Sequence, residues 1–107
     1  MITDDEVEKC VDFLRDNAVK IAQAKANAMH MDDYTKVVKA KIMRENNGDE
    51  SLGAREARAY ADARYTAHLD TKKIADEEYE RLRWLMDAAS AKIDVWRTMS
   101  SNNRKGL

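Results

Sequence analysis

The stretch ADEEYERLRWLMDAASAKIDVW, residues 75–96, decides the fold because it holds the most regular hydrophobic pattern in the chain. Its apolar residues recur at alternating spacings of four and three: Ala75, Tyr79, Leu82, Met86, Ala89, Ile93 and Trp96. This is the heptad pattern of a helix that packs lengthwise against another helix. Trp84 and Leu85 flank the heptad and widen it, which suits contact with more than one helix. We expect an oligomer interface here, formed by Tyr79, Leu82, Met86, Ile93 and Trp96.

An earlier helix is predicted over about residues 4–45. Thr3 and Glu6 fit a capping box, and Ile2 with Val7 fits a hydrophobic staple. A heptad then follows through Val7, Val11, Leu14, Ala18 and Ile21, and it resumes through Ala28, Met31, Tyr34, Val38 and Ile42. Asp32 allows a break near that residue, but one continuous helix is the preferred prediction.

A polar turn is predicted at residues 46–51. Asn46, Asn47 and Gly48 tolerate the left-handed conformation that ends a helix, and Ser51 can cap the next one. The second helix is then expected over about residues 52–100, with a polar tail at 101–107. The predicted fold is a single all-α domain, residues 1–107, in which two long antiparallel helices form a coiled-coil-like hairpin that oligomerises.

Composition agrees with this fold. The chain has 107 residues, of which 36% are charged, with no proline and three glycines, as long helices require. Two helices alone bury little, so oligomerisation is expected to complete the core. The single cysteine, Cys10, excludes an intrachain disulfide and is read as a small core residue. The acidic start, and the lack of the roughly 20 apolar residues of a membrane span, predict a cytoplasmic protein.

Signatures of catalysis are absent from the sequence. The glycines are scattered, so no phosphate-binding loop exists. His30 and His68 lie in no metal-ligand spacing and are read as surface or seam residues. The acids of residues 76–80 point in different directions on a helix, so they do not converge. We therefore expect a protein that is not an enzyme and needs no cofactor or metal.

A basic segment offers the main functional hint. Residues 36–64 carry seven cations against five acids, a net charge of +2 in a chain with a net charge of −1. The predicted DNA-binding residues are Lys36, Lys39, Lys41, Arg44, Arg55 and Arg58. A hairpin would bring them together at its turn, beside Tyr34, Tyr60 and Tyr65. Cations beside aromatic rings are typical of single-strand binders, although a charged run is often only a solvated helix face.

The run Lys36-Val37-Val38-Lys39-Ala40-Lys41, the polar turn and the late pattern Ala-x-x-x-Ile-Asp-x-x-Arg resemble the UvsY-like family of phage recombination mediators over residues 20–100. The resemblance implies an oligomer that binds single-stranded DNA and helps load a RecA-like recombinase against a single-strand binding protein. It implies a phage protein in the host cytoplasm. It also implies that Lys39 and Lys41 contribute to DNA binding, although the family has arginine where Lys41 stands.

Two other functions remain open. The protein could be a small inhibitor that binds a host defence or repair complex, in the manner of anti-CRISPR proteins, because its polarised charge suits a nucleic-acid site on a partner. It could also be a structural coiled-coil subunit, in which case the seam residues Leu82 and Ile93 would matter and the basic segment would not.

Overall fold

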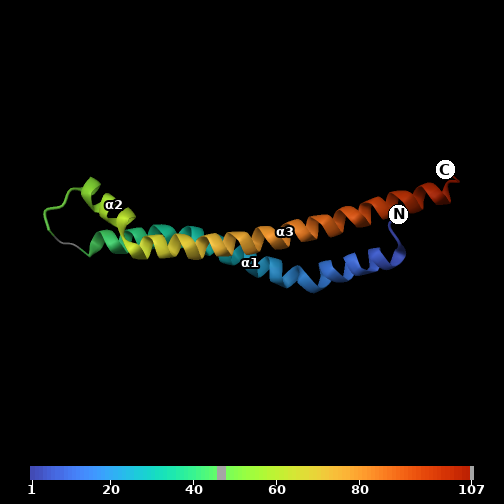
Figure 1. Cartoon of the computed structure of the whole chain (residues 1–107), viewed down its shortest axis with the longest axis horizontal. Helices are drawn as coiled ribbons and strands as arrows, with labels where there is room; N and C mark the ends of the chain where they lie inside the picture. The colour runs from blue at the N-terminus through green and yellow to red at the C-terminus, as the bar shows by residue number, and fades with distance from the viewer. Residues whose placement is uncertain (46–47, 107) are drawn as a thin grey trace. The chain divides into compact units, whose positions relative to one another are not determined.

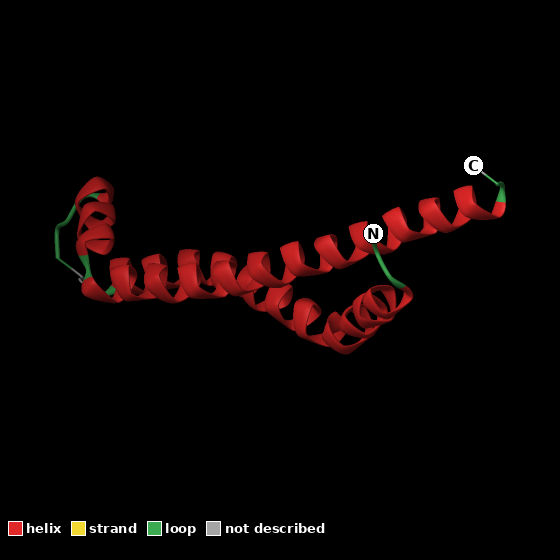
Figure 2. Ribbon diagram, turned by 45° about the vertical axis from the view of Figure 1, so that its right-hand side comes forward, coloured by secondary structure: helices red, strands yellow, loops and turns green. Residues whose placement is uncertain are grey.

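The computed structural model describes residues 1–45 and 48–106, and the described chain is helical. It contains α1 (Asp4–Arg44), α2 (Leu52–Ala61) and α3 (Ala63–Arg104) (Figure 1). No strand occurs among the described residues, as the colouring of Figure 2 makes plain. The all-α prediction, with long helices paired as a hairpin, is confirmed. Assembly into an oligomer stays a prediction.

The chain divides into two compact units, each built from both long helices. Unit 1 comprises Met1–Gln23 and Glu80–Leu107, and unit 2 comprises Ala24–Tyr79. The helices are antiparallel in each. In unit 1, the Trp96 indole Nε1 donates to Asp4 Oδ1 at 2.9 Å. In unit 2, Lys72 Nζ lies 3.9 Å from Asp32 Oδ1.

The start of α1 follows the predicted capping box. The Thr3 backbone N–H donates to Glu6 Oε2 at 3.3 Å, and the Glu6 N–H donates to Thr3 Oγ1 at 3.2 Å. The helix then continues without interruption to Arg44. The alternative of a break near Asp32 is therefore excluded, because Asp32 lies within the helix and reaches across to Lys72.

The heptad of α3 is the inner face of the hairpin. Ala75, Leu82 and Ala89 are buried, at 7%, 4% and 7% exposure. The other residues of the heptad, Tyr79, Met86, Ile93 and Trp96, are half-buried. Four of the five predicted interface residues are thus half-buried and Leu82 is buried within the single chain. Contact between subunits through the same side chains stays a prediction.

The predicted heptad of α1 was wrong at two positions. Val11 is 47% exposed and Ala18 is also exposed, whereas Cys10 and Asn17 take the inner positions. The inner face follows spacings of three, four and three from Val7, through Cys10 and Leu14 to Asn17. Small or polar residues therefore lie inside, and the more apolar Val11 lies outside. Asn17 satisfies its amide locally, because its Nδ2 donates to the Phe13 carbonyl at 2.9 Å.

A polar layer interrupts the seam in unit 2. His68 is buried at 9% exposure, and its Nε2 lies 2.8 Å from Thr35 Oγ1 and 3.1 Å from the Met31 carbonyl oxygen. A carbonyl only accepts, so Nε2 carries the proton in this arrangement. The interpretation of His68 as a seam residue therefore fits its hydrogen bonds, which satisfy it within the core.

The second helix is not continuous, which corrects the predicted span of 52–100. Ser51 caps α2 as expected, accepting the Ala54 N–H at 3.2 Å. Asp62 then adopts an extended backbone, with φ −72° and ψ 136°, and its Oδ1 accepts the Arg64 N–H at 2.8 Å. An aspartate that bonds the backbone ahead of it ends one helix and caps the next. The predicted cap at Asn46 and Asn47 lies outside the described residues.

The C-terminal end of α3 also differs from expectation. The helix continues through Ser100 and Ser101 to Arg104, so the residues predicted as a polar tail from 101 onward are partly helical. Gly106 adopts a φ of +72°, in the left-handed region that glycine enters without steric cost. None of the described helices combines the length and apolarity that crossing a membrane requires.

The substitution Ile42→Ala tests where the core of unit 2 lies. Ile42 is 1% exposed, whereas Ile74 is 68% exposed on α3. Removing the buried side chain leaves a cavity, so the free energy of unfolding should fall by about 3 kcal/mol. Ile74→Ala should change it by less than about 0.5 kcal/mol. Urea unfolding followed by circular dichroism measures both, and equal losses would contradict this core.

Candidate nucleic-acid interface

The predicted basic residues gather where α1 ends and α2 begins. This part of unit 2, residues 34–64, is called the tip below. Its core consists of Ile42 and Ala59, which are 1% and 0% exposed. Figure 1 shows α2 beside the last turns of α1. The six predicted cations therefore lie on neighbouring helices, but they do not have equal freedom to bind a ligand.

Arg58 is committed to the fold. Its Nε donates to both carboxylate oxygens of Glu50, at 3.2 and 3.1 Å. Its terminal nitrogens donate to the backbone carbonyls of Ile42 at 2.9 Å and Met43 at 3.3 Å. Those carbonyls belong to the last turn of α1, whose final carbonyls have no partner within the helix. Arg58 thus fastens α2 to the C-terminal end of α1 and leaves little for a phosphate.

Lys39 joins α1 to α2 through an aromatic ring. Its ammonium donates to the Tyr60 hydroxyl at 2.8 Å and lies 4.7 Å from the ring centroid. Glu56 Oε1 is 3.9 Å away. The hydrogen bond to Tyr60, with the negative charge of Glu56, raises the pKa of Lys39 above its ordinary value. Tyr60 itself is 51% exposed, so the pair stands at the surface.

Lys41 forms a second pair of this kind, within α1. Its Nζ donates to the Tyr34 hydroxyl at 3.3 Å and lies 5.5 Å from the ring centroid. Tyr34 also contacts two histidine rings, with centroids 5.8 Å from His30 and 5.7 Å from His68. Lys41 is exposed while Tyr34 is half-buried. The tyrosine is therefore held by its neighbours, with the lysine on its outer edge.

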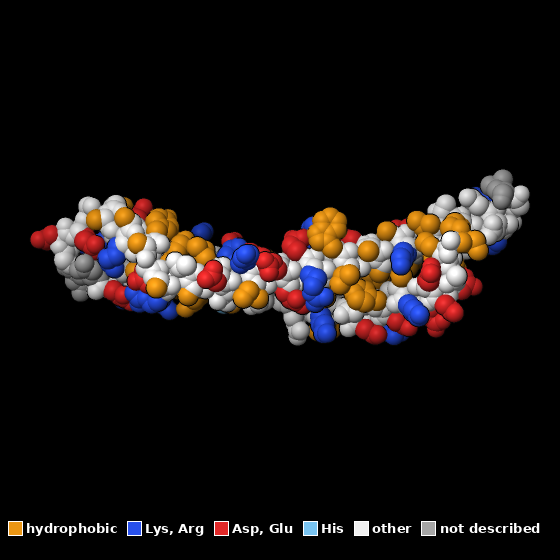
Figure 3. All heavy atoms as spheres, in the orientation of Figure 1, with side chains coloured by type: hydrophobic (Ala, Val, Ile, Leu, Met, Phe, Trp, Pro, Cys, Tyr) orange, Lys and Arg blue, Asp and Glu red, His pale blue; other side chains and the backbone are white. Residues whose placement is uncertain are grey.

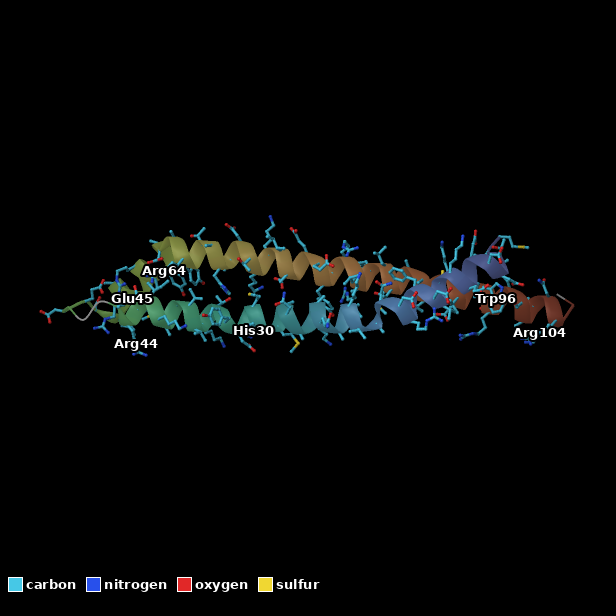
Figure 4. All side chains as sticks on the ribbon, turned by 90° about the horizontal axis from the view of Figure 1, so that it is seen from below. His30, Arg44, Glu45, Arg64, Trp96 and Arg104 are labelled. Carbon is cyan, nitrogen blue, oxygen red and sulfur yellow. The ribbon has the colours of Figure 1, made fainter. Side chains whose placement is uncertain are left out.

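The remaining three predicted cations make no side-chain hydrogen bond of the kind described for Arg58, Lys39 and Lys41 to any residue that the structure describes. They are Lys36, Arg44 and Arg55. Lys36 and Arg44 are exposed and have no polar partner in the described chain. Figure 4 shows Arg44 pointing away from the helices. Arg55 is half-buried, and its Nε is enclosed with no hydrogen-bond partner among the residues described. Lys36 and Arg44 are thus the freest of the six predicted cations.

Arg64, which is not among those six, holds the junction between α1 and α3. Its terminal nitrogens donate to the Glu45 carboxylate at 2.5 and 2.6 Å and to Asp62 Oδ2 at 2.9 Å. Figure 4 shows Arg64 and Glu45 together at this end. Hydrogen bonds from Arg64 lower the pKa of Asp62 to about 2 and also lower the pKa of Glu45. The same partners raise the pKa of Arg64.

A groove of about 430 Å³ opens between α1 and α3 beside these residues. Tyr34 and Lys41 line it from α1, and Arg64, His68 and Thr71 line it from α3. Cationic and aromatic side chains thus share one concave surface with Glu45, which already accepts hydrogen bonds from Arg64. A ligand that offers both an anionic group and a flat ring matches this lining.

The described residues include no group of three or more His, Cys, Asp or Glu side chains that could hold a metal ion. The acids predicted not to converge are tied to cations of their own helix, with Lys72–Asp76 at 2.6 Å and Lys73–Glu77 at 4.0 Å. The chain matches no family model, curated protein or solved structure.

Arg58→Met tests the assignment of Arg58 to the fold. Loss of its charged hydrogen bonds to Glu50, Ile42 and Met43 should lower the free energy of unfolding by about 2 kcal/mol. Amide hydrogen exchange of α2 should accelerate in parallel. Arg44→Met, at an exposed position, is the matched control and should leave both unchanged within about 0.5 kcal/mol. If Arg58→Met lowered the free energy of unfolding no more than the control did, the assignment of Arg58 to holding α2 against the end of α1 would be wrong.

Acid should loosen the junction around Asp62 only at low pH, because hydrogen bonds from Arg64 lower the pKa of Asp62 to about 2. Carboxyl groups whose pKa values are lowered by folding contribute stability above their unfolded pKa values, and that stability is lost as pH falls through the folded values. For Asp62 the window runs from about 4 down to about 2. Carboxyl-carbon NMR shifts should locate the Asp62 titration near 2. Arg64→Gln should move it up toward the ordinary value, and an unmoved titration would disprove the pairing.

Proposed function

We propose that the tip binds single-stranded DNA and that the protein is an accessory factor in phage recombination or replication. One observation carries the proposal: two lysine–tyrosine pairs, Lys39–Tyr60 and Lys41–Tyr34, lie at the surface of the same unit. Tyrosine faces stack on unpaired bases, and neighbouring ammonium groups attract the phosphates between them. Duplex DNA hides its base faces, so this combination favours a single strand.

The tip residues would contact DNA in different ways, depending on how exposed each side chain is and which partners it already has. Lys36, Lys41 and Arg44 are exposed and supply the attraction for phosphate. Lys39 is half-buried and orients Tyr60, so it acts mainly through the ring. Arg58 holds α2 in place and acts as a positioning residue. Arg55 is enclosed on its Nε and contributes less than its charge suggests.

The resemblance to UvsY-like mediators supports the biological role. The two lysines that match that family's basic triplet, Lys39 and Lys41, are the two that pair with tyrosines. In that role the protein would act on DNA coated by a single-strand binding protein and would assist a RecA-like recombinase. It would work in the host cytoplasm as a homo-oligomer. Binding of this kind requires no covalent step and no cofactor.

The triple variant Lys36→Ala/Lys41→Ala/Arg44→Ala tests the proposal. Fluorescence anisotropy with a labelled oligonucleotide, repeated across a salt series, should show weakened binding. Each phosphate contact on a single strand contributes about −0.7 to the slope of log K against log salt concentration. Loss of three contacts should therefore flatten the slope by about 2. Tyr60→Leu should weaken binding without changing the slope, because a stacking contact releases no counterions.

The matched control removes three exposed lysines outside the tip, Lys20, Lys25 and Lys105. It changes the net charge of the chain by the same amount, so it separates a local site from general attraction. If both triple variants weakened oligonucleotide binding equally, the binding would depend on net charge and not on a site at the tip. Absence of binding by the unmodified chain at low salt would end the proposal.

A protein partner is the second candidate, and the exposed apolar side chains of α3 favour it. Ile74 and Trp84 are 68% and 63% exposed, which is unusual for residues of this size. An inhibitor that binds a protein complex through such a surface need not bind polyanions. Retention on heparin or oligonucleotide resin therefore distinguishes the two functions at once.

A further inference from the structure

The C-terminal part of α3 carries a second heptad on its outer surface. Trp84, Ala88, Ala91 and Val95 are spaced by four, three and four residues, parallel to the seam that faces α1. All four are exposed, with Trp84 at 63% and Val95 at 50%. These residues are called the outer seam. A heptad stripe exposed on a helix that is already paired indicates a further helix as its neighbour.

An apolar groove extends the outer seam toward α1. Ala88 lies on both, and Leu85, which is 44% exposed, lines the groove with Cys10, Phe13 and Ala89. The groove has a volume of about 300 Å³ and lies within unit 1. Orange apolar side chains are visible among charged ones on this half of the chain in Figure 3. The contact surface is therefore wider than one row of residues.

Charges beside the outer seam identify its occupant. On the side away from the groove lie Glu80, Asp87 and Asp94, seven residues apart, and on the groove side lies Lys92. Glu80 pairs with Arg83 at 3.4 Å and Asp94 with Arg97 at 3.7 Å, both within α3. Asp87 and Lys92 have no polar partner in the described chain. The two unpaired flanking charges are opposite in sign and five residues apart.

This spacing matches the pairing across a parallel two-stranded coiled coil. There, the residue before one core position lies near the residue five positions later in the partner helix. Two copies of α3 running in the same direction would place Asp87 of each beside Lys92 of the other, forming two ion pairs by symmetry. Antiparallel copies would instead place Asp87 opposite Asp94, with repulsion at both ends.

We propose that the outer seam binds a second copy of this chain, forming a parallel two-fold dimer through α3. Ala88 and Ala91 at the centre allow the helix backbones to approach closely, and Trp84 and Val95 close the two ends. The contact spans about two heptads, so it buries less than a standard interface and the dimer is weak, with a Kd on the order of micromolar. The inference rests on unit 1 and does not depend on DNA binding by the tip.

Sedimentation velocity of the full chain, without nucleic acid, tests the dimer over roughly 1 to 1,000 µM, a range that brackets the expected Kd. The unmodified chain should pass from monomer to dimer. Ala91→Glu inserts a charge into the outer seam and should abolish the transition. Ser90→Glu, one residue along but off the seam, should not. Circular dichroism confirms that both variants keep their helices, since both positions are exposed.

Charge reversal tests the direction of the helices. Asp87→Lys or Lys92→Asp alone should raise the dimer Kd about tenfold by replacing two attractive pairs with two repulsive ones. The double variant Asp87→Lys/Lys92→Asp should restore it. In an antiparallel dimer, Asp87→Lys would strengthen association instead, which would overturn the parallel arrangement. A monomer at every concentration would overturn the dimer, whatever the tip binds.

Discussion

The constraint on which the rest of the structure depends is that each long helix has one long neighbour. A single interhelical seam must supply most of the core, and here that seam is narrow: Val7, Ala28, Ile42, Ala75, Leu82 and Ala89 are its buried apolar residues. Alanine brings helix backbones close together but contributes little buried area. Large apolar side chains such as Trp84, Ile74 and Val19 consequently remain on the surface, at 63–68% exposure. A chain built this way keeps apolar surface available for a further partner.

The same constraint explains how charge is used at the tip. With few apolar contacts to hold α2, the chain fastens it with arginine. Arg58 bridges Glu50 and the end of α1, and Arg64 bridges Glu45 and Asp62. Arg58 and Arg64, which look available for a ligand in the sequence, are therefore engaged in contacts within the fold. What remains for a ligand is Lys36, Lys41 and Arg44, together with the rings of Tyr34 and Tyr60.

Local signals in the sequence predicted the features that depend on local structure. The capping box at Thr3, the cap at Ser51 and the α3 heptad follow from residues close together along the chain. The inner position of Asn17 and the partners of Arg58 do not, because they depend on which face of α1 meets α3 and on how α2 returns to α1. Aspartate is a common N-cap residue, so Asp62 could have indicated the break between α2 and α3. The alanine-rich sequence around it favoured a continuous helix instead.

The DNA binding proposed for the tip and the dimer proposed through α3 would be linked, because a dimer carries two tips. A net charge of +2 over residues 36–64 gives one chain little hold on a polyanion. If two chains join through unit 1 as proposed, the second tip would bind at a higher effective concentration once the first has bound. DNA binding and dimerisation would then reinforce each other, since a strand bound by both tips would favour the dimer by the same factor as the dimer favours the strand. Cooperative, salt-sensitive binding by a nearly neutral protein would follow from this linkage.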